Sequence, residues 1–162
     1  MRLITIQHKN VLKTLLSGQV YYAPPTVSKN LQKPYQKMLE HYKWYVKAPV
    51  FACVEGRYCE FYGAKTEKSC ILVLDVPDEQ IKLQGYYNWV DVIYFTELPG
   101  EWDSIMSLEK FTEYTLDGKN IRDRDAVQAT IPYIHPNWLS NYRKKFNKYV
   151  GSGGNYILEK VM

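Results

Sequence analysis

The stretch Cys70-Ile-Leu-Val-Leu-Asp-Val76 decides the fold class, because all but one of its residues are apolar. Pro77 follows it directly and ends the run. A continuous apolar run of this length is typical of a strand that is buried on both faces of a sheet. We therefore predict a strand over residues 70–76, with Leu72 and Leu74 in the core.

Further strands are predicted on both sides of this run. Residues 2–7 alternate in polarity and contain two isoleucines, which predicts a strand near the centre of the sheet. Residues 50–54 and 57–62 are short apolar or aromatic runs around Gly56, a pattern that favours a β-hairpin. The apolar residues at 126–131 predict another strand.

Helices are predicted where apolar residues recur three and four positions apart. In chain order they are a short helix from Asn10 to Gly18, a longer one opened by Ser28 or Asn30, a short one at residues 108–114, and a last one that begins at Pro136. Asp78 and Glu79 suit a single helical turn. Residues 88–95 fit one helical face, while their β-branched and aromatic residues keep a strand interpretation open.

These elements predict a single α+β domain over residues 1–162, with a central, mostly antiparallel mixed sheet flanked by short helices. The length of 162 residues, with 46% hydrophobic and 23% charged residues, fits one globular domain. Gly151-Ser-Gly-Gly154 predicts a flexible linker before an edge strand at 156–158. No apolar stretch has the length of a membrane span and residues 1–7 lack signal-peptide features, so we expect a cytoplasmic protein.

Residues with redox or metal chemistry are sparse. Cys53, Cys59 and Cys70 are an odd number without a C-x-x-C pair, so we expect reduced thiols in the core and neither a disulfide scaffold nor a zinc site. The three histidines lie far apart in the sequence, and phosphate-binding glycine loops and nucleophile elbows are absent from it. No metal site is predicted, and no common motif names an activity.

The segment Asn141-Tyr-Arg-Lys-Lys-Phe-Asn-Lys-Tyr149 concentrates four cationic residues among three aromatic ones. Such a composition suits phosphate neutralisation and base stacking. It predicts a surface for nucleic acid or a partner protein, made of Arg143, Lys144, Lys145 and Lys148. The alternative is the solvated face of the last helix, which fits the mild net charge of +4.

Short blocks of sequence, taken in chain order, also carry a family resemblance. They are Thr5-Ile6-Gln7, Gly18-Gln-Val-Tyr21, Tyr35-Gln-Lys-Met38, Pro49-Val-Phe-Ala52, Leu74-Asp-Val-Pro-Asp78 with Trp89, and Gln128-Ala129-Thr130 with Trp138. The series resembles the bacterial domain of unknown function family 3841 over about residues 2–146. The chain departs from it at Ile4, where members often have Trp, and at Leu83-Gln-Gly85, where members often have an acidic loop. The resemblance implies a bacterial, phage or other mobile-element origin and no activity.

A second, weaker resemblance rests on the order of the predicted elements. A strand, a helix ending in Ser-Gly, an extended Val-Tyr segment, a strand ending in Asp-x-Pro and a late strand before a helix follow one another. This order is similar to that of the small ADP-ribosyltransferase-like domains, which implies an NAD site. In those domains a first-strand polar residue holds the NAD ribose, aromatic residues clamp the nicotinamide, and a late-strand glutamate supports the reaction.

Carried over by position, this resemblance assigns roles to residues of the chain. The assignments are Thr5 or Gln7 for the ribose contact, Tyr21, Tyr22 or Tyr62 for the clamp, and Gln128 or Thr130 for the late-strand polar group. The chain departs from the pattern because no glutamate stands on residues 126–131. Gln128 donates and accepts hydrogen bonds but is not a carboxylate base. Either Asp123 or Asp125 supplies the carboxylate from the loop, or the site binds a nucleotide without turning it over.

Two classes of function therefore remain. The leading one is binding of a nucleotide such as NAD, with an ADP-ribosyltransferase-like reaction that would use Gln128 and Asp125. The competing one is a non-catalytic module, such as an inhibitor carried by a mobile element, that captures nucleic acid or a protein. A structural role is the alternative for Gln7 and Gln128, because polar side chains inside a sheet need partners. Trp89 and Trp138 are expected as core anchors.

Overall fold

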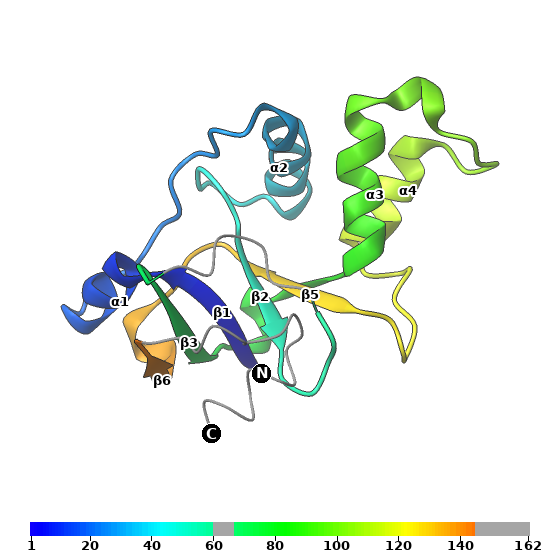
Figure 1. The fold of residues 1–162 in the computed structure, drawn as a ribbon. Coiled ribbons are helices and arrows are strands. Elements are labelled where there is room, and N and C mark those ends of the chain that lie inside the picture. The colour runs from blue at the N-terminus through cyan, green and yellow to red at the C-terminus, as the bar shows by residue number, and fades with distance from the viewer. Residues whose placement is uncertain (60–66, 145–162) are drawn as a thin grey trace.

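Six antiparallel strands form one sheet in the order β4-β5-β2-β1-β3-β6 in the computed structural model, which describes residues 1–59 and 67–144 (Figure 1). The strands are β1 (Arg2–His8), β2 (Val50–Val54), β3 (Ser69–Asp75), β4 (Lys82–Gly85), β5 (Val127–Ile131) and β6 (Leu139–Arg143). The helices are α1 (Lys9–Leu16), α2 (Lys29–Tyr42), α3 (Tyr86–Glu97) and α4 (Leu108–Leu116), with short 3-10 turns at Asp78–Gln80, Pro99–Glu101 and Pro136–Trp138. The predicted α+β class is confirmed, and every pairing between the described strands is antiparallel.

The two strands that the apolar patterns indicated most clearly lie side by side inside the sheet. β1 and β3 pair along seven consecutive residues, from Arg2 opposite Asp75 to His8 opposite Ser69. Leu72 and Leu74 are fully buried, as predicted. Because β3 is covered on both faces, its continuous apolar run is the pattern that burial requires.

The two faces of the sheet pack against different helices. α1 packs its buried residues Val11, Leu12 and Leu15 on the face that carries Leu3, which we call the α1 side. α2, α3 and α4 gather on the other face, where Met38, Trp89, Val92 and Leu116 form a second core cluster with Phe51. We call this face the three-helix side, and Figure 1 shows α1 well apart from these three helices. Residues 88–95 belong to α3 because its buried Tyr86, Trp89 and Val92 lie at helical spacing.

Two predictions of local structure are wrong. The turn at Glu55-Gly56 forms, with Gly56 at a φ of 77°, but β2 pairs with β1 and β5 instead of with residues 57–59. Pro136 opens one 3-10 turn instead of a helix, and the chain continues as β6 on the outer edge of β3. In both cases a distant strand offers hydrogen bonds that the local pattern does not reveal. The predicted linker at 151–154 and the edge strand at 156–158 lie outside the described residues.

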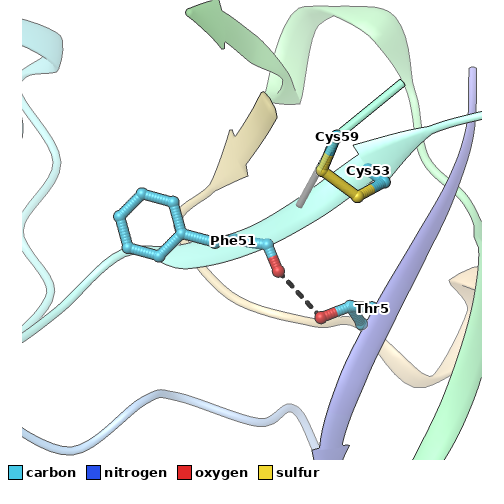
Figure 2. The surroundings of a disulfide bond; sticks show 4 residues. All are labelled: Thr5, Phe51, Cys53 and Cys59. Atoms are coloured by element: carbon cyan, nitrogen blue, oxygen red, sulfur yellow. Dashed lines mark hydrogen bonds between the residues drawn. A yellow bond between two sulfur atoms is a disulfide. The ribbon is translucent and has the colours of Figure 1, made fainter. Parts of the chain in front are cut away.

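The prediction of reduced cysteines is also wrong for two of the three. Cys53 and Cys59 form a disulfide (Figure 2). Cys70 is free and buried. The turn after β2 brings the Cα atoms of Cys53 and Cys59 to 5.7 Å, within the range that a disulfide spans. Sequence spacing alone did not show this disulfide, because the approach of the two cysteines depends on the turn.

None of the described helices has the length and apolar character that crossing a membrane requires.

Candidate functional site

The two central strands of the sheet, β1 and β2, pair at one end only. Their register contains Leu3 opposite Val54 and Ile4 opposite Cys53. Beyond these two pairs the strands separate, and Figure 1 shows them converging near the N-terminus and diverging toward the other end. We call the separated part, residues 5–8 of β1 and 50–52 of β2, the fork.

Inside the fork β1 and β2 form no backbone pairs, and a side-chain hydrogen bond from β1 connects the two strands instead. The Thr5 hydroxyl donates a hydrogen bond of 2.7 Å to the carbonyl oxygen of Phe51, as Figure 2 shows. The same hydroxyl oxygen accepts a bond of 2.8 Å from Nε2 of Gln7. Thr5 is 1% exposed, so this bond lies away from solvent. The Thr5 side chain therefore lies between β1 and β2 and keeps the two backbones apart in the fork.

A hollow of about 160 Å³ lies in the fork. Its lining residues are Ile6, Gln7, Ala23, Pro49, Val50, Phe51, Ala52 and Gln128. Gln128 is opposite Cys53, which is opposite Ile4, so these three residues share the three-helix side. Gln7 is three positions from Ile4 on the same strand and belongs to the α1 side. Because residues of both faces line it, the hollow passes between the strands.

Gln128 is the buried polar residue of this hollow. Its side chain is 1% exposed, and its Nε2 donates a hydrogen bond of 3.3 Å to Oε1 of Gln84. Its Oε1 is buried and has no hydrogen-bond partner among the described residues. A buried acceptor without a donor costs about 1–3 kcal/mol, and few native groups are left in that state. Gln128 thus lines the fork hollow and carries a buried acceptor atom that has no described partner.

A chain of hydrogen bonds orients Gln128 from behind. Gln84 Nε2 donates to the Tyr42 hydroxyl at 2.6 Å and to the Thr130 hydroxyl at 2.9 Å. Tyr42 in turn donates to the carbonyl oxygen of Leu116 at 2.6 Å. Burial raises the pKa of Tyr42 well above its ordinary value, so the phenol keeps its proton and remains a donor. Thr130 is therefore engaged beneath the three helices and does not line the fork hollow.

Neither described tyrosine of the predicted aromatic clamp lines the fork hollow. Tyr21 exchanges two backbone hydrogen bonds of 2.9 Å with Ile134, which brings the following Ala23 to the hollow. Tyr22 is 57% exposed, and its ring lies 5.7 Å from that of Tyr133. Tyr62 lies outside the described residues.

Asp125 lies away from the fork. It lines a different hollow, together with Arg122 and residues at the start of α3. Its carboxylate accepts hydrogen bonds from the backbone nitrogen of Arg122 at 2.8 Å and from Nε of the same residue at 3.4 Å. The backbone bond lowers the pKa of Asp125, so its carboxylate is committed to Arg122. The structure does not bring Asp125 and Gln128 to one hollow.

The predicted basic surface is described only in part. Arg143 ends the edge strand β6, and Lys144 follows it with Nζ 5.9 Å from the centre of the Tyr142 ring. Lys145 and Lys148 lie outside the described residues. The two tryptophans differ, because Trp89 is fully buried whereas Trp138 is half-buried and stacks on Tyr133.

Three residues that shape the site were missed from the sequence. Phe51 supplies the carbonyl that Thr5 holds, and Gln84 and Tyr42 position Gln128. The only available signal was Gln84 itself, a polar residue where the resembled family has an acidic loop. No cluster of three metal-ligating side chains occurs in residues 1–59 and 67–144.

Comparisons with family models, with curated proteins and with solved structures found no match to this chain.

Proposed function

We propose that this protein binds a nucleotide of the NAD type, with one planar ring of the ligand in the fork between β1 and β2. The observation that carries the proposal is that Gln128, whose buried Oε1 has no described partner, lines a hollow that Gln7 also lines. Gln7 and Gln128 come from opposite ends of the sequence. Their meeting supports the roles that the resemblance to ADP-ribosyltransferase-like domains implies for a first-strand and a late-strand polar residue.

The volume of the hollow limits how much of the ligand it can hold. At about 160 Å³ it is smaller than the roughly 300–1,000 Å³ of usual small-molecule pockets. It therefore suits a single ring, and the rest of a dinucleotide would lie outside it. Ile6, Pro49 and Phe51 provide apolar walls for the faces of such a ring.

The acceptor of Gln128 determines which chemical group of the ligand ring would match this part of the hollow. Because Gln128 Oε1 is an acceptor, the matching ligand group is an N–H donor, such as a ring carboxamide or an amino group. The nicotinamide carboxamide and the adenine amino group both meet this requirement. Gln7 donates to Thr5, which turns its amide toward the fork in a defined orientation.

The proposal concerns binding and not turnover. None of the described residues that line the fork hollow carries a carboxylate, an imidazole or a thiol. Hydrogen bonding and ring packing are the interactions that these residues offer. A transfer reaction would need a carboxylate from elsewhere, and Asp125 is bonded to Arg122 in another hollow.

The test is a titration of the purified protein with NAD, nicotinamide and ADP-ribose, followed by calorimetry. Gln7→Ala and Gln128→Ala are each expected to weaken binding by roughly 5-fold to 150-fold, the equivalent of about 1–3 kcal/mol for an unpaired polar group. Their combined effect should be smaller than the sum, because both contact one ligand. Gln32→Ala is the matched control, since Gln32 is exposed on α2 and does not line the hollow.

Comparison of affinity with stability separates the proposal from a structural role. The proposal predicts that Gln7→Ala keeps a melting temperature close to that of the parent. Gln128→Ala also removes the donor to the buried Gln84, so it is compared with the parent by its affinity at a temperature where both are folded. It fails if NAD, nicotinamide and ADP-ribose all leave the parent protein unbound. It also fails if the variants lose several degrees of melting temperature and retain the parent affinity.

A further inference from the structure

A second, larger hollow lies where the C-terminal ends of α2 and α4 meet β4. Its volume is about 520 Å³, within the usual range of small-molecule pockets. Its lining residues are His41, Tyr42, Lys43, Ile81, Lys82, Leu83, Leu116, Asp117, Gly118 and Ile121. We call it the lysine hollow, because Lys43 and Lys82 are its two fully cationic residues.

The lysine hollow carries more positive charge than its own carboxylate balances. Asp117 is the acidic residue in the lining, and its Oδ1 lies 2.7 Å from Nε2 of His41. Its Oδ2 lies 3.8 Å from Nζ of Lys119. Within residues 1–59 and 67–144, neither Lys43 nor Lys82 has a carboxylate at ion-pair distance. Both ammonium groups are available to an anionic ligand.

The backbone at Lys43 is unfavourable for a lysine. Lys43 has a φ of 56° and a ψ of 41°, which is the left-handed conformation, and it is the only non-glycine residue with a positive φ among those described. It closes α2, donating to the carbonyl of Glu40 at 3.2 Å while Trp44 donates to that of Leu39 at 2.9 Å. Glycine is the residue that usually fills this position, because a Cβ costs about 1 kcal/mol or more there. A side chain kept at this cost suggests a use for the side chain.

Two carbonyl groups near the end of α4, which borders the hollow, are already hydrogen-bonded. Carbonyl groups at the end of a helix repel anions when they are left free. Here the Leu116 carbonyl accepts a bond from the Tyr42 hydroxyl, and the Glu113 carbonyl accepts one from the Asp117 nitrogen at 2.9 Å. These two carbonyls are already hydrogen-bonded and do not compete for the ammonium groups of Lys43 and Lys82.

One wall of the lysine hollow is apolar. Ile81, Leu83 and Ile121 line it, and the Tyr42 ring lies beneath Nζ of Lys82 at 5.9 Å from the ring centre. A ligand that fills this volume would therefore place a hydrocarbon or aromatic body against the apolar wall. Its anionic group would face the ammonium groups.

We propose that the lysine hollow is a binding site for a small organic anion, in which a phosphate or carboxylate group is joined to an aromatic or aliphatic body. Lys43 and Lys82 neutralise the anionic group, and the His41–Asp117 pair fixes the ends of α2 and α4 around it. The proposal goes beyond nucleotide binding at the fork and does not depend on it, because the two hollows share no lining residue.

The test uses phenyl phosphate, benzoate and inorganic phosphate as probes, with amide chemical shifts of the full chain as the readout. Phenyl phosphate or benzoate should bind and shift amides around Lys43, Lys82 and Asp117, and the tighter of the two identifies the anionic group. Inorganic phosphate should bind several-fold more weakly, because it leaves the apolar wall empty. Binding should weaken as sodium chloride is raised.

Three variants decide whether the hollow is the cause. Lys82→Gln should weaken binding about tenfold or more, the loss expected for one charge-assisted contact. Lys43→Gly should weaken binding to a similar degree while raising the denaturation midpoint, because glycine relieves the left-handed conformation. This opposite effect on stability shows that lost binding does not come from lost folding. Lys33→Gln, on the exposed face of α2, removes the same charge elsewhere and should bind like the parent.

Two outcomes would overturn the proposal. One is no amide shift with millimolar phenyl phosphate and benzoate in the parent protein. The other is equal affinity of the parent, Lys82→Gln and Lys43→Gly, which would place the anion elsewhere on the surface. Failure at the fork with NAD would leave both of these measurements unchanged, so the two proposals are tested separately.

Discussion

The two edges of β1 are used differently. On one edge β1 pairs with β3 along its whole length, and on the other it joins β2 through two residue pairs before the strands separate. The closed edge buries an apolar strand, whereas the open edge is crossed by the side chain of Thr5, which also accepts a hydrogen bond from Gln7 of the same strand. One strand thus contributes stability on one side and a polar hollow on the other. A sheet can open a site at its centre when the ladder beside it remains complete.

The largest effect is expected at the closed edge. Leu74→Ala should lower the free energy of unfolding by about 2–5 kcal/mol, because Leu74 is fully buried and its truncation leaves a cavity. Urea denaturation followed by tryptophan fluorescence measures this loss. Leu16→Ala, at a 55% exposed position of α1, is the control and should change stability by less than about 0.5 kcal/mol. An unchanged midpoint for Leu74→Ala would remove the distinction between the two edges.

The disulfide tests the closed end of the fork. Cys53 belongs to the last pair before β1 and β2 separate, and its bond to Cys59 encloses a short loop. Reduction should lower the free energy of unfolding by about 2 kcal/mol, the value expected for a loop of this length. Urea denaturation with and without reductant measures the change, and Cys59→Ala should be insensitive to reductant. Equal stability of the oxidised and reduced protein would show that the disulfide does not anchor the fork.

The hydroxyl of Thr5 tests the open edge directly. Thr5→Val keeps the shape of the side chain but removes the hydrogen bond to Phe51 and the acceptor for Gln7. The expected loss of stability is about 1 kcal/mol, the usual net contribution of one hydrogen bond. NAD affinity should fall as well, whereas Thr5→Ser retains the hydroxyl and should retain the affinity. A Thr5→Val protein with parental stability and affinity would mean that the bond does not hold the fork open.

The smallest effect is expected at the exposed end of the closed edge. Arg2 Nε lies 2.9 Å from Asp75 Oδ1, and this hydrogen bond lowers the pKa of Asp75 in the folded protein. A lowered folded-state pKa adds stability above the unfolded value of about 4, and this contribution is lost as pH falls through the folded pKa. Asp75→Asn should therefore be slightly less stable than the parent at pH 7, because exposed ion pairs contribute little.

Denaturation midpoints of parent and Asp75→Asn between pH 7 and pH 2 measure this difference. The gap should begin to narrow below about pH 4 and close once the pH falls below the lowered folded-state pKa of Asp75, where the parent carboxylate becomes protonated. A gap that widens in acid would contradict the assigned cause of the pKa shift.

Prediction from the sequence succeeded where burial alone sets the pattern. β3 is mostly an apolar run and β5 is mixed in polarity, but both are buried along nearly all of their length, and both strands were predicted close to their observed bounds. β6 was missed because an edge strand is largely exposed and shows no such pattern. The helix over 88–95 stayed ambiguous until Trp89 and Val92 were seen packed against α2 and α4.

Two residues that line the candidate hollow, Gln7 and Gln128, were selected from the sequence, but the arrangement of the site was not predictable. Thr5, Gln7 and Gln128 were selected as polar residues on predicted strands, through a resemblance that stays a prediction. Their neighbours Phe51 and Gln84 act through a backbone carbonyl and a buried amide, and neither leaves a pattern in the sequence. Asp125 was paired with Gln128 by proximity along the chain, yet it lies in another hollow.

The sequence by itself determined the α+β class, the presence of β1 and β3 as strands and the burial of Leu72 and Leu74. These features depend on local periodicity and on the removal of apolar side chains from water, and the order of neighbouring residues in the chain reveals both. Only the tertiary structure decided which strands pair, where β1 and β2 separate, and which cysteines join. Those outcomes depend on contacts between residues far apart in the chain, where a strand edge accepts whichever partner completes its hydrogen bonds.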